Sequence, residues 1–197
     1  MCIFLIVRHG QSTLNLARRV NGDPSVMVAL TEQGEEEARL LGAQLANVPL
    51  DACVHTRFER TRRTAELALA CRGIPLVEEP LLDDIDVGEL EGETIERYRE
   101  WKRANGRDVP FPGGESLDGA ARRYGAAYRR LLETPFRAVL VVTHEIPLRY
   151  ALNAAAGSDR LDGPAHEIPN ARPYLFDEEA LACAAAGIEG LAGVAAR

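Results

Sequence analysis

Two short segments of the chain consist only of apolar residues, and each is followed within two residues by a histidine. The first runs from Ile3 to Val7 and continues as Arg8-His9-Gly10, and the second runs from Ala138 to Val142 and continues as Thr143-His144. Uninterrupted apolar runs of this length are typical of strands buried on both faces, as in the middle of a parallel sheet. We therefore expect two central strands that bring both histidines to the carboxyl edge of one sheet, where open α/β sheets bind their ligands.

Segments with helical spacing separate the segments that resemble strands. Thr31 is suited to cap a helix in which Ala38, Leu41 and Leu45 share one apolar face. Residues 16–30 and 81–92 are expected to form loops, and the tail after residue 177 is expected to be helical or frayed. The alternation predicts an α/β fold with a largely parallel sheet. The remaining helices are expected over residues 59–71, 94–104, 147–156 and from 116 onward, and shorter strands over 51–55, 74–77 and 172–176.

The charge balance of the chain excludes some classes of partner. Its 197 residues carry a formal net charge of −7, which argues against nucleic acid or an anionic membrane as a partner. A small anionic ligand stays open, because local arginines can still form a positive pocket. No apolar run is long enough to span a bilayer and no basic region precedes the first one, so we expect a cytoplasmic protein without a signal peptide. The four cysteines show no CxxC spacing, and we interpret them as small buried hydrophobic residues.

Arginines are concentrated at the start of the helix expected over residues 59–71. The segment contains Arg57, Arg60, Arg62 and Arg63. Guanidinium groups donate paired hydrogen bonds to phosphoryl oxygens, so arginines that converge with the two histidines would suit a phosphate ligand. We expect Arg60 to point inward and Arg62 and Arg63 to lie on a solvated helix face, whereas the pattern leaves the direction of Arg57 open.

Five motifs follow one another along the first three quarters of the chain. They are RHGQS at residues 8–12 with Asn15, TRFER at 56–60 followed by Thr64-Ala65, GELEG at 88–92, PGGES at 112–116, and Thr143-His144. With this set the chain resembles the histidine phosphatase superfamily, in the branch of phosphoglycerate mutase-like phosphatases. The resemblance implies a three-layer α/β/α sandwich with a mostly parallel central sheet. It also implies a single domain over residues 1–197, with loop or lid insertions at about 16–30 and 93–115.

The same resemblance implies how the site works. His9 would attack the phosphorus atom in line and form a phosphohistidine. Arginines would stabilise the charge of the transition state, so that neither a metal nor another cofactor is needed. The residues implied for holding the phosphoryl oxygens are Arg8, Arg60 and His144, with Ser12 and Asn15 either adding hydrogen bonds or fixing the loop.

The proton donor is the point at which the chain departs from the family pattern. The family usually has a glutamate four residues before the first glycine of GELEG, and Asp84 occupies that place with a shorter side chain. We assign Asp84 as the catalytic acid, with Asp83, Asp86 and Glu145 as rivals. Glu145 is also grouped with the phosphate-binding residues, because its carboxylate would lie close to them and could raise the pKa of a neighbour or repel a very anionic substrate.

Several other polar or aromatic residues have simpler interpretations. Glu115 is expected to orient the GGES turn, and Trp101 is expected to pack within a lid. His55 is expected to end a strand close enough to the pocket to line it. His166 is expected on a loop, either at the surface or just behind the site, and Asn170 is expected to form a hydrogen bond near the site.

These features favour a metal-independent phosphomonoesterase that acts on a small phosphorylated metabolite. Phosphoglycerate mutase-type transfer is the alternative within the family, and it is disfavoured because the segment 93–112 is too short for the insertion of cofactor-dependent mutases. A relative that binds a phosphorylated ligand without turnover is a second alternative, whereas the arginines disfavour a metal hydrolase. The sequence does not define the substrate. It also leaves the oligomeric state open, and a homodimer is one possibility.

Overall fold

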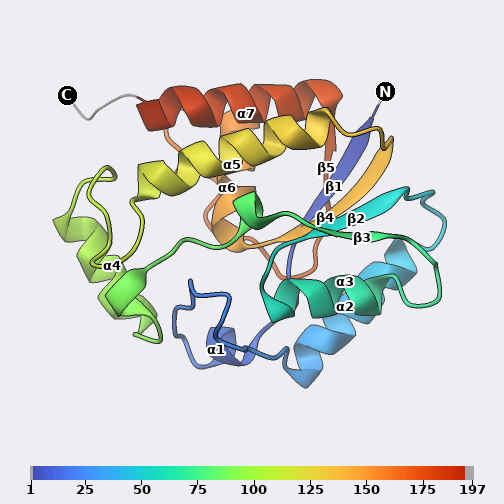
Figure 1. Cartoon of the computed structure of the whole chain (residues 1–197), viewed down its shortest axis with the longest axis horizontal. Coiled ribbons are helices and arrows are strands. Elements are labelled where there is room, and N and C mark those ends of the chain that lie inside the picture. Colours follow the sequence, from blue (N-terminus) through green and yellow to red (C-terminus); the bar gives the residue numbers. More distant parts are fainter. Residues whose placement is uncertain (1, 194–197) are drawn as a thin grey trace.

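A five-stranded sheet forms the centre of the computed structural model, which describes residues 2–193 (Figure 1). The strand order is β3-β2-β4-β1-β5, and every pairing is parallel except that of β5 with β1. The predicted α/β fold with a mostly parallel sheet is thereby confirmed. The strands are β1 (Ile3–Arg8), β2 (Ala52–His55), β3 (Leu76–Glu78), β4 (Ala138–Thr143) and β5 (Tyr174–Asp177).

The pairing of β1 with β4 places the two histidines beside each other. Val7 is in register with Val142 and Arg8 with Thr143, so the residues that follow each strand leave the sheet at the same level. Every residue of β4 is buried, as expected for a strand in the middle of a covered sheet. The carboxyl edge of the sheet therefore presents two histidines from segments that are far apart in the sequence.

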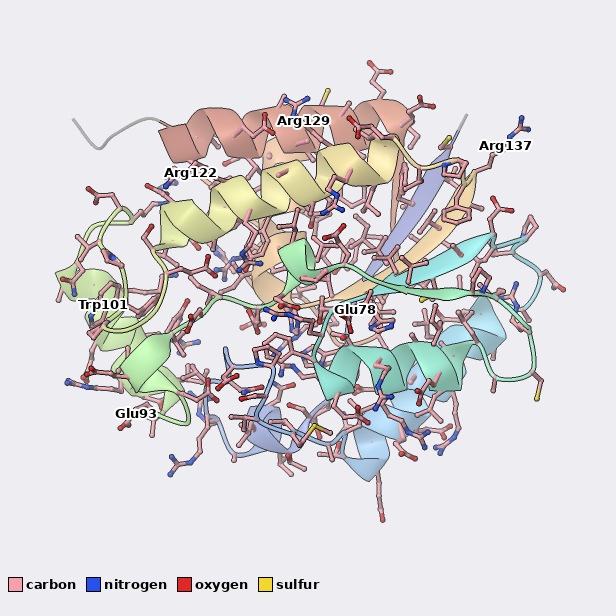
Figure 2. The ribbon with its side chains drawn as sticks, viewed as in Figure 1. Glu78, Glu93, Trp101, Arg122, Arg129 and Arg137 are labelled. Atoms are coloured by element: carbon pink, nitrogen blue, oxygen red, sulfur yellow. The ribbon has the colours of Figure 1, made fainter. Side chains whose placement is uncertain are left out.

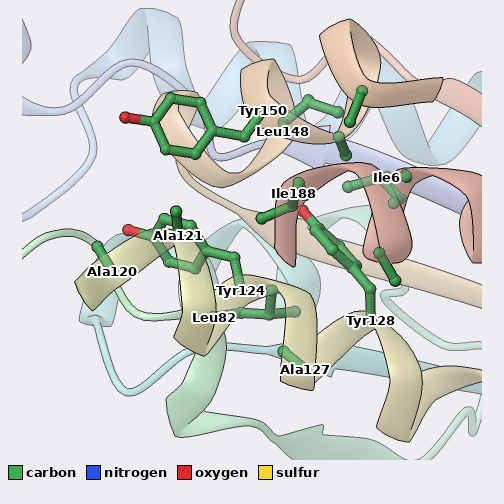
Figure 3. Packing of buried hydrophobic residues seen from close by; sticks show 14 of the residues in the cluster. Ile6, Leu82, Ala120, Ala121, Tyr124, Ala127, Tyr128, Leu148, Tyr150 and Ile188 are labelled. Atoms are coloured by element: carbon green, nitrogen blue, oxygen red, sulfur yellow. The ribbon is translucent and has the colours of Figure 1, made fainter. Parts of the chain in front are cut away.

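Helices cover both faces of the sheet and complete three layers (Figure 1). On one face lie α5 (Leu117–Leu132), α6 (Glu145–Ala155) and α7 (Glu178–Gly193), and Figure 3 shows how side chains such as Tyr128 and Ile188 pack between them. On the other face lie α2 (Glu32–Gln44) and α3 (Glu59–Ala68), which bury Leu41 and Ala65 against the sheet. Apolar burial on both faces is the main stabilising contribution to such a fold.

The C-terminal tail is a structural element of the core and is not frayed over its described part. The helix α7 buries Leu181, Ala184, Ala185 and Ile188, and it packs along α5 and α6. Its alanine-rich face allows close approach to both neighbours. Residues 194–197 of the tail lie outside the described residues.

Several element boundaries differ from those predicted. The short helix α1 (Thr13–Leu16) lies where a loop was expected to begin, and α6 begins at Glu145, two residues earlier than predicted. Pro147 is compatible with this start because the first turn of a helix needs no backbone donor there. The helix α4 (Ile95–Ala104) was predicted, and short 3₁₀ turns at Pro80–Leu82 and Gly88–Leu90 interrupt the predicted acidic loop.

The cysteines are only partly as predicted. Cys53 is buried and Cys2 is half-buried, but Cys71 and Cys183 are exposed, so the prediction of four buried cysteines was wrong for these two. All four are free thiols in the structure. None of the helices within residues 2–193 is long and apolar enough to cross a membrane.

The backbone after β1 packs directly against the start of α2. A Cβ atom on Gly34 would lie 2.0 Å from the carbonyl oxygen of Gln11, and one on Gly10 would lie 2.3 Å from the carbonyl oxygen of Gly34. Thr31, which caps α2, donates its backbone N–H to the same Gln11 oxygen at 2.9 Å. The loop that carries the RHGQS motif is thus positioned by contacts that only glycine permits.

We expect Gly34→Ala to lower the free energy of unfolding by about 1–3 kcal/mol, because the new methyl group overlaps a backbone oxygen that cannot move without shifting the motif. The measurement is the midpoint and slope of urea unfolding. Gly190→Ala is the matched control, since a Cβ at this exposed position of α7 meets nothing within 4 Å. The control should leave stability unchanged or raise it by up to about 1 kcal/mol, and equal effects of the two substitutions would contradict the expectation.

Candidate active site

His9 is held at the edge of the sheet by hydrogen bonds from three different segments. Its backbone N–H donates to the carbonyl oxygen of Thr143 at 2.9 Å, and its own carbonyl oxygen accepts from the side-chain amide of Asn170 at 2.7 Å. The next residue, Gly10, donates its N–H to the hydroxyl of Thr64 at 3.0 Å. The hydrogen bond predicted for Asn170 near the site is therefore present, and it fixes the backbone of His9.

The ring of His9 is fixed in one tautomer. Its Nδ1 lies 2.7 Å from the carbonyl oxygen of Gly10, which can only accept, so Nδ1 carries the proton. Its Nε2 accepts a hydrogen bond from Nε of Arg60 at 3.0 Å. Burial, reinforced by the charges of Arg60 and Arg8, lowers the pKa of His9 well below its ordinary value. His9 is thus a neutral imidazole whose Nε2 carries a lone pair.

Arg60 is the inward-pointing member of the arginine cluster, and its side chain is 4% exposed. Besides His9, its guanidinium group bonds to Nδ1 of His144 at 3.1 Å and to Oδ2 of Asp84 at 3.1 Å. It also donates to the side-chain oxygen of Asn21 and, at 3.2 Å, to the backbone oxygen of the same residue. Asn21 lies in the segment 16–30 that was expected to form a loop, and no pattern in the sequence linked it to Arg60.

His144 faces His9 across the edge of the sheet, with ring centroids 5.4 Å apart. Because Arg60 donates to its Nδ1, its Nε2 carries the proton and donates to the hydroxyl of Thr56 at 3.0 Å. Burial and the charge of Arg60 lower the pKa of His144 well below its ordinary value. Two neutral histidines therefore surround one charged guanidinium group.

Arg8 approaches the site from the end of β1. Its Nη1 donates to the carbonyl oxygen of Ile168 at 2.9 Å and lies 3.0 Å from Oε2 of Glu145. The other carboxylate oxygen of Glu145 lies 3.4 Å from Nη1 of Arg149. Glu145 is close to the predicted phosphate-binding residues, as expected. Its carboxylate pairs with both Arg8 and Arg149, and Arg149 was not predicted to belong to the site.

Among the candidate acids of the loop 81–92, Asp84 lines the same cavity as His9. Burial raises the pKa of its carboxyl group, and the charge of Arg60 partly opposes that effect. Its neighbour Asp83 instead accepts from Nε of Arg57 at 2.5 Å and from the backbone N–H of Arg57 at 2.9 Å. Asp86 accepts the backbone N–H of Gly88 at 2.9 Å, within a turn. The side chain of Arg57, whose direction the sequence left open, is thus paired with Asp83 and lies outside this cavity.

Ser12 and Asn15 line the cavity and cap each other at the start of α1. The backbone N–H of Ser12 donates to the side-chain oxygen of Asn15 at 3.1 Å, and the backbone N–H of Asn15 donates to the hydroxyl of Ser12 at 3.2 Å. This reciprocal capping box satisfies donors that a short helix would otherwise leave free. Two roles were predicted for Ser12 and Asn15, binding the phosphoryl group or fixing the loop, and these hydrogen bonds correspond to the second.

A cavity of about 660 Å³ opens beside His9, and α4 forms one of its walls. The helix contains no fully buried residue, and it is anchored by aromatic stacking of Trp101 and Tyr98 on Phe111, with ring centroids 4.1 and 5.5 Å apart. Figure 2 shows Trp101 at this outer side of the molecule. The prediction that Trp101 packs within a lid is consistent with this position.

The remaining singled-out residues lie away from the cavity. His55 is buried at the end of β2 and does not line the cavity, so the expectation that it lines the pocket was wrong. His166 is exposed on a loop, as expected. Glu115 pairs with Arg123 and accepts the backbone N–H of Asp86 at 3.1 Å, so it orients the turn as predicted. Across residues 2–193, no group of three His, Cys, Asp or Glu side chains is arranged to hold a metal ion.

Comparison with known proteins places this arrangement in a family. A family model described as histidine phosphatase superfamily (branch 1) matches residues 4–182. The chain is 33% identical over 151 residues to "Probable phosphoglycerate mutase GpmB" from Photorhabdus laumondii, which covers 73% of this chain and 69% of the relative. The structure superposes on Bacillus stearothermophilus YhfR with a TM-score of 0.79 at 25% identity, covering 90% and 91% of the two chains. It also superposes on the alpha-ribazole phosphatase from Shigella flexneri (TM-score 0.76, 23% identity, 89% and 90% covered), a likeness that shows the fold alone.

The two neutral histidines predict how stability depends on pH. In the unfolded chain each would titrate near 6.5, whereas burial holds its pKa lower in the folded protein. The unfolded state therefore binds more protons below that pH, and stability that is complete above it is lost as the pH falls. We expect the free energy of unfolding to decrease between pH 7.5 and 5.5 with a limiting slope of about 1.4 kcal/mol per pH unit for each histidine.

Urea unfolding at several pH values measures this slope for the parent protein and for His144→Gln. The variant should lose about half of the slope in this window, whatever its overall stability. His166→Gln serves as the control because that histidine is exposed on a loop, and its slope should equal that of the parent. Identical slopes for the parent and His144→Gln would show that His144 is not held neutral by folding.

Proposed function

The chain belongs to the histidine phosphatase superfamily, and we propose that within this family it is a phosphomonoesterase that acts on a small phosphorylated metabolite through a phosphohistidine. The observation that carries the proposal is the state of His9. It is a buried neutral imidazole whose Nδ1–H donates a hydrogen bond to the Gly10 carbonyl oxygen, so that the lone pair is on Nε2, where it accepts a hydrogen bond from Arg60. A nucleophile in this state needs no further deprotonation before it attacks phosphorus.

The charges around His9 support the binding of a phosphoryl group. Arg60 and Arg8 supply guanidinium groups, and His144 supplies a ring that can donate once it reorients or gains a proton. In a buried site, such preorganised donors stabilise the three equatorial oxygens of a phosphoryl transition state strongly. Arginines would repel a metal cation, which supports the proposal that the reaction is independent of metal.

Asp84 is the group best placed to handle the leaving-group proton. In the first step Nε2 of His9 forms a bond to phosphorus, the ester P–O bond breaks, and the leaving oxygen takes the proton of the Asp84 carboxyl group. In the second step the Asp84 carboxylate takes a proton from water as the hydroxyl oxygen attacks phosphorus and the P–N bond breaks. The raised pKa of Asp84 supports the protonated form that the first step requires. Glu145 is less suited, because two arginines hold its carboxylate.

Mutase-type transfer is a second candidate, because relatives of similar length carry the name phosphoglycerate mutase. Both reactions begin with the same phosphohistidine, and they differ in whether water or a second hydroxyl group receives the phosphoryl group. A mutase must exclude water from the phosphoenzyme. Here the lid is one ten-residue helix with no fully buried residue, which favours hydrolysis.

We expect His9→Gln to lower the release of phosphate from p-nitrophenyl phosphate and from 3-phosphoglycerate by at least about 1,000-fold, because the nucleophile is lost. In the parent protein, rapid quenching should trap a phosphoryl group on His9 that is stable in alkali and labile in acid. His166→Gln should retain full activity. Conversion of 3- to 2-phosphoglycerate faster than phosphate release would favour the mutase, and phosphate binding without turnover would identify a non-catalytic relative.

The role of Asp84 predicts a dependence on the leaving group. Asp84→Asn should slow the hydrolysis of alkyl phosphates by about 100-fold or more, since an alkoxide needs a proton in order to leave. The loss in kcat/KM, which reports the first step alone, should be much smaller with p-nitrophenyl phosphate, because p-nitrophenolate leaves readily as an anion. Glu145→Gln is the comparison variant and should show no such contrast between the two substrates. If Asp84→Asn retains turnover while Glu145→Gln loses it, the acid is Glu145.

A further inference from the structure

The second glutamate of the GELEG motif, Glu91, is tied to the site although it does not line the cavity beside His9. It lines a second cavity, of about 550 Å³, on the other side of the turn at residues 21–23. Asn21 lines the first cavity and the next two residues of the turn line the second, so the turn lies between them. Glu91 therefore reaches the reacting groups only at a distance or through this turn.

Three hydrogen bonds connect the carboxylate of Glu91 to the turn. Its Oε2 accepts the backbone N–H groups of Gly22 at 2.6 Å and of Asp23 at 3.1 Å, and its Oε1 accepts the side-chain amide of Asn21 at 2.7 Å. The charge of the carboxylate strengthens each of these bonds. From the opposite direction the turn packs on the acidic loop, because a Cβ atom on Gly22 would lie 2.0 Å from the carbonyl oxygen of Ile85. The turn is thus held from two sides.

These contacts determine which way the side-chain amide of Asn21 points. Its nitrogen faces two groups that only accept, the Glu91 carboxylate and the carbonyl oxygen of Asp23 at 3.1 Å. Its oxygen faces Nη1 of Arg60, which only donates. The backbone oxygen of Asn21 accepts a second bond from Arg60, at 3.2 Å. A single amide therefore links the carboxylate to the guanidinium group, and its orientation cannot be reversed without losing hydrogen bonds at both ends.

The hydrogen bonds from Arg60 to Asn21 are the ones that the reaction can leave in place. The lone pair on Nε2 of His9 that accepts from Nε of Arg60 is the one that would attack phosphorus, so this hydrogen bond has to open. The bonds to Asn21 involve no reacting atom. They can hold the guanidinium group in position while its other donors pass to the phosphoryl oxygens. Donors that are fixed in advance stabilise a transition state without a cost of reorganisation.

We propose that Glu91 is a positioning residue for phosphoryl transfer, which orients the side-chain amide of Asn21 and thereby holds Arg60 toward the phosphoryl group. The inference rests on the proposed phosphomonoesterase function, in which Arg60 stabilises the equatorial oxygens. The electrostatics agree with it, because burial lowers the pKa of Arg60 and the charges of Asp84 and Glu91 oppose that effect. Glu91 thus also supports the charged state of an enclosed guanidinium group.

Glu91→Gln tests the proposal with almost no change of shape. The new amide oxygen can still accept the two backbone N–H groups, but its NH2 group then faces the NH2 group of Asn21. Relief of this repulsion turns a donor of Asn21 toward Arg60 and displaces the guanidinium group. We expect kcat/KM for p-nitrophenyl phosphate to fall about 10- to 100-fold, with the larger part of the loss in kcat.

Proton NMR of the histidine rings gives a second measurement that does not depend on turnover. The charge of Arg60 contributes to the lowered pKa of His9 and of His144. A displaced guanidinium group lowers these values less, so both rings should titrate at a higher pH in Glu91→Gln than in the parent protein.

Glu89→Gln is the matched control, because it is the same substitution two residues earlier, at an exposed side chain that lines neither cavity. It should keep the kcat/KM and the histidine titrations of the parent. Asn21→Leu removes the linking amide and should cause a loss similar to that of Glu91→Gln. In the combined variant the two losses should not add, since one residue acts through the other.

The alternative is that Glu91 only stabilises the turn. Glu91→Gln would then lower the midpoint of urea unfolding and leave kcat and both histidine titrations of the folded protein unchanged, which would overturn the proposal. Losses that add in the combined variant would overturn it too. If Glu91→Gln fails to fold, Asn21→Leu decides the question, and parental kcat and titrations in that variant would reject the proposal.

The histidine titrations also separate this inference from the proposed function. If the parent protein hydrolyses no phosphate ester, the proposed function fails while the position of Arg60 can still be tested. Titration at a higher pH in Glu91→Gln and in Asn21→Leu, but not in Glu89→Gln, would support the role of Glu91 in holding Arg60. Unchanged titrations in all three variants would reject it.

Discussion

The burial of the Arg60 guanidinium group is the constraint on which the rest of the site depends. A charged side chain that is 4% exposed is stable only where acceptors replace the lost water. Its acceptors are ring nitrogens of His9 and His144, the Asp84 carboxylate and the oxygens of Asn21, which come from four separate segments. The two central strands must be neighbours, and two loops must fold over α3, before these groups can meet. The same guanidinium group helps to keep both histidines neutral, so the folding of the site and its chemistry depend on one side chain.

Local patterns in the sequence predicted the central elements well and the outer ones less well. The strands β1 and β4 are built on uninterrupted apolar runs, Thr31 caps the helix it was expected to cap, and Ser116 stands at the start of the helix expected from residue 116 onward. The order of the strands is not encoded in such patterns, because the pairing of β1 with β4 depends on packing across more than 130 residues of sequence. The sequence of α7 fits a helix or a frayed tail equally, because its alanine-rich segment gains stability from burial against α5 and α6 and little from its own polar pattern.

Sequence reasoning about the site succeeded where the residue type itself carries the chemistry. His9, His144 and Arg60 were expected to converge, and they lie within hydrogen-bonding distance of one another through Arg60. Asn21 and Arg149 could not be found in this way, because their partners depend on the path of a loop and on the rotation of a helix. The sequence alone also could not distinguish the neighbouring aspartates. Asp84 lines the cavity, whereas Asp83, one residue earlier in the same loop, pairs with the exposed side chain of Arg57.

The contrast between the net charge of the chain and the charge of its cavity has a physical consequence for selectivity. Fields from exposed carboxylates are screened over about 8–10 Å at physiological salt, and they disfavour polyanions that must cover a wide surface. Inside the cavity the arginines act at contact distance and in a partly desolvated environment, where their attraction is far stronger. A small anion that enters comes within range of Arg8, Arg60 and Arg149 and leaves the repelling surface behind. Under the proposed function, this arrangement would favour compact phosphorylated molecules over nucleic acids by size, without any contact that reads the identity of either.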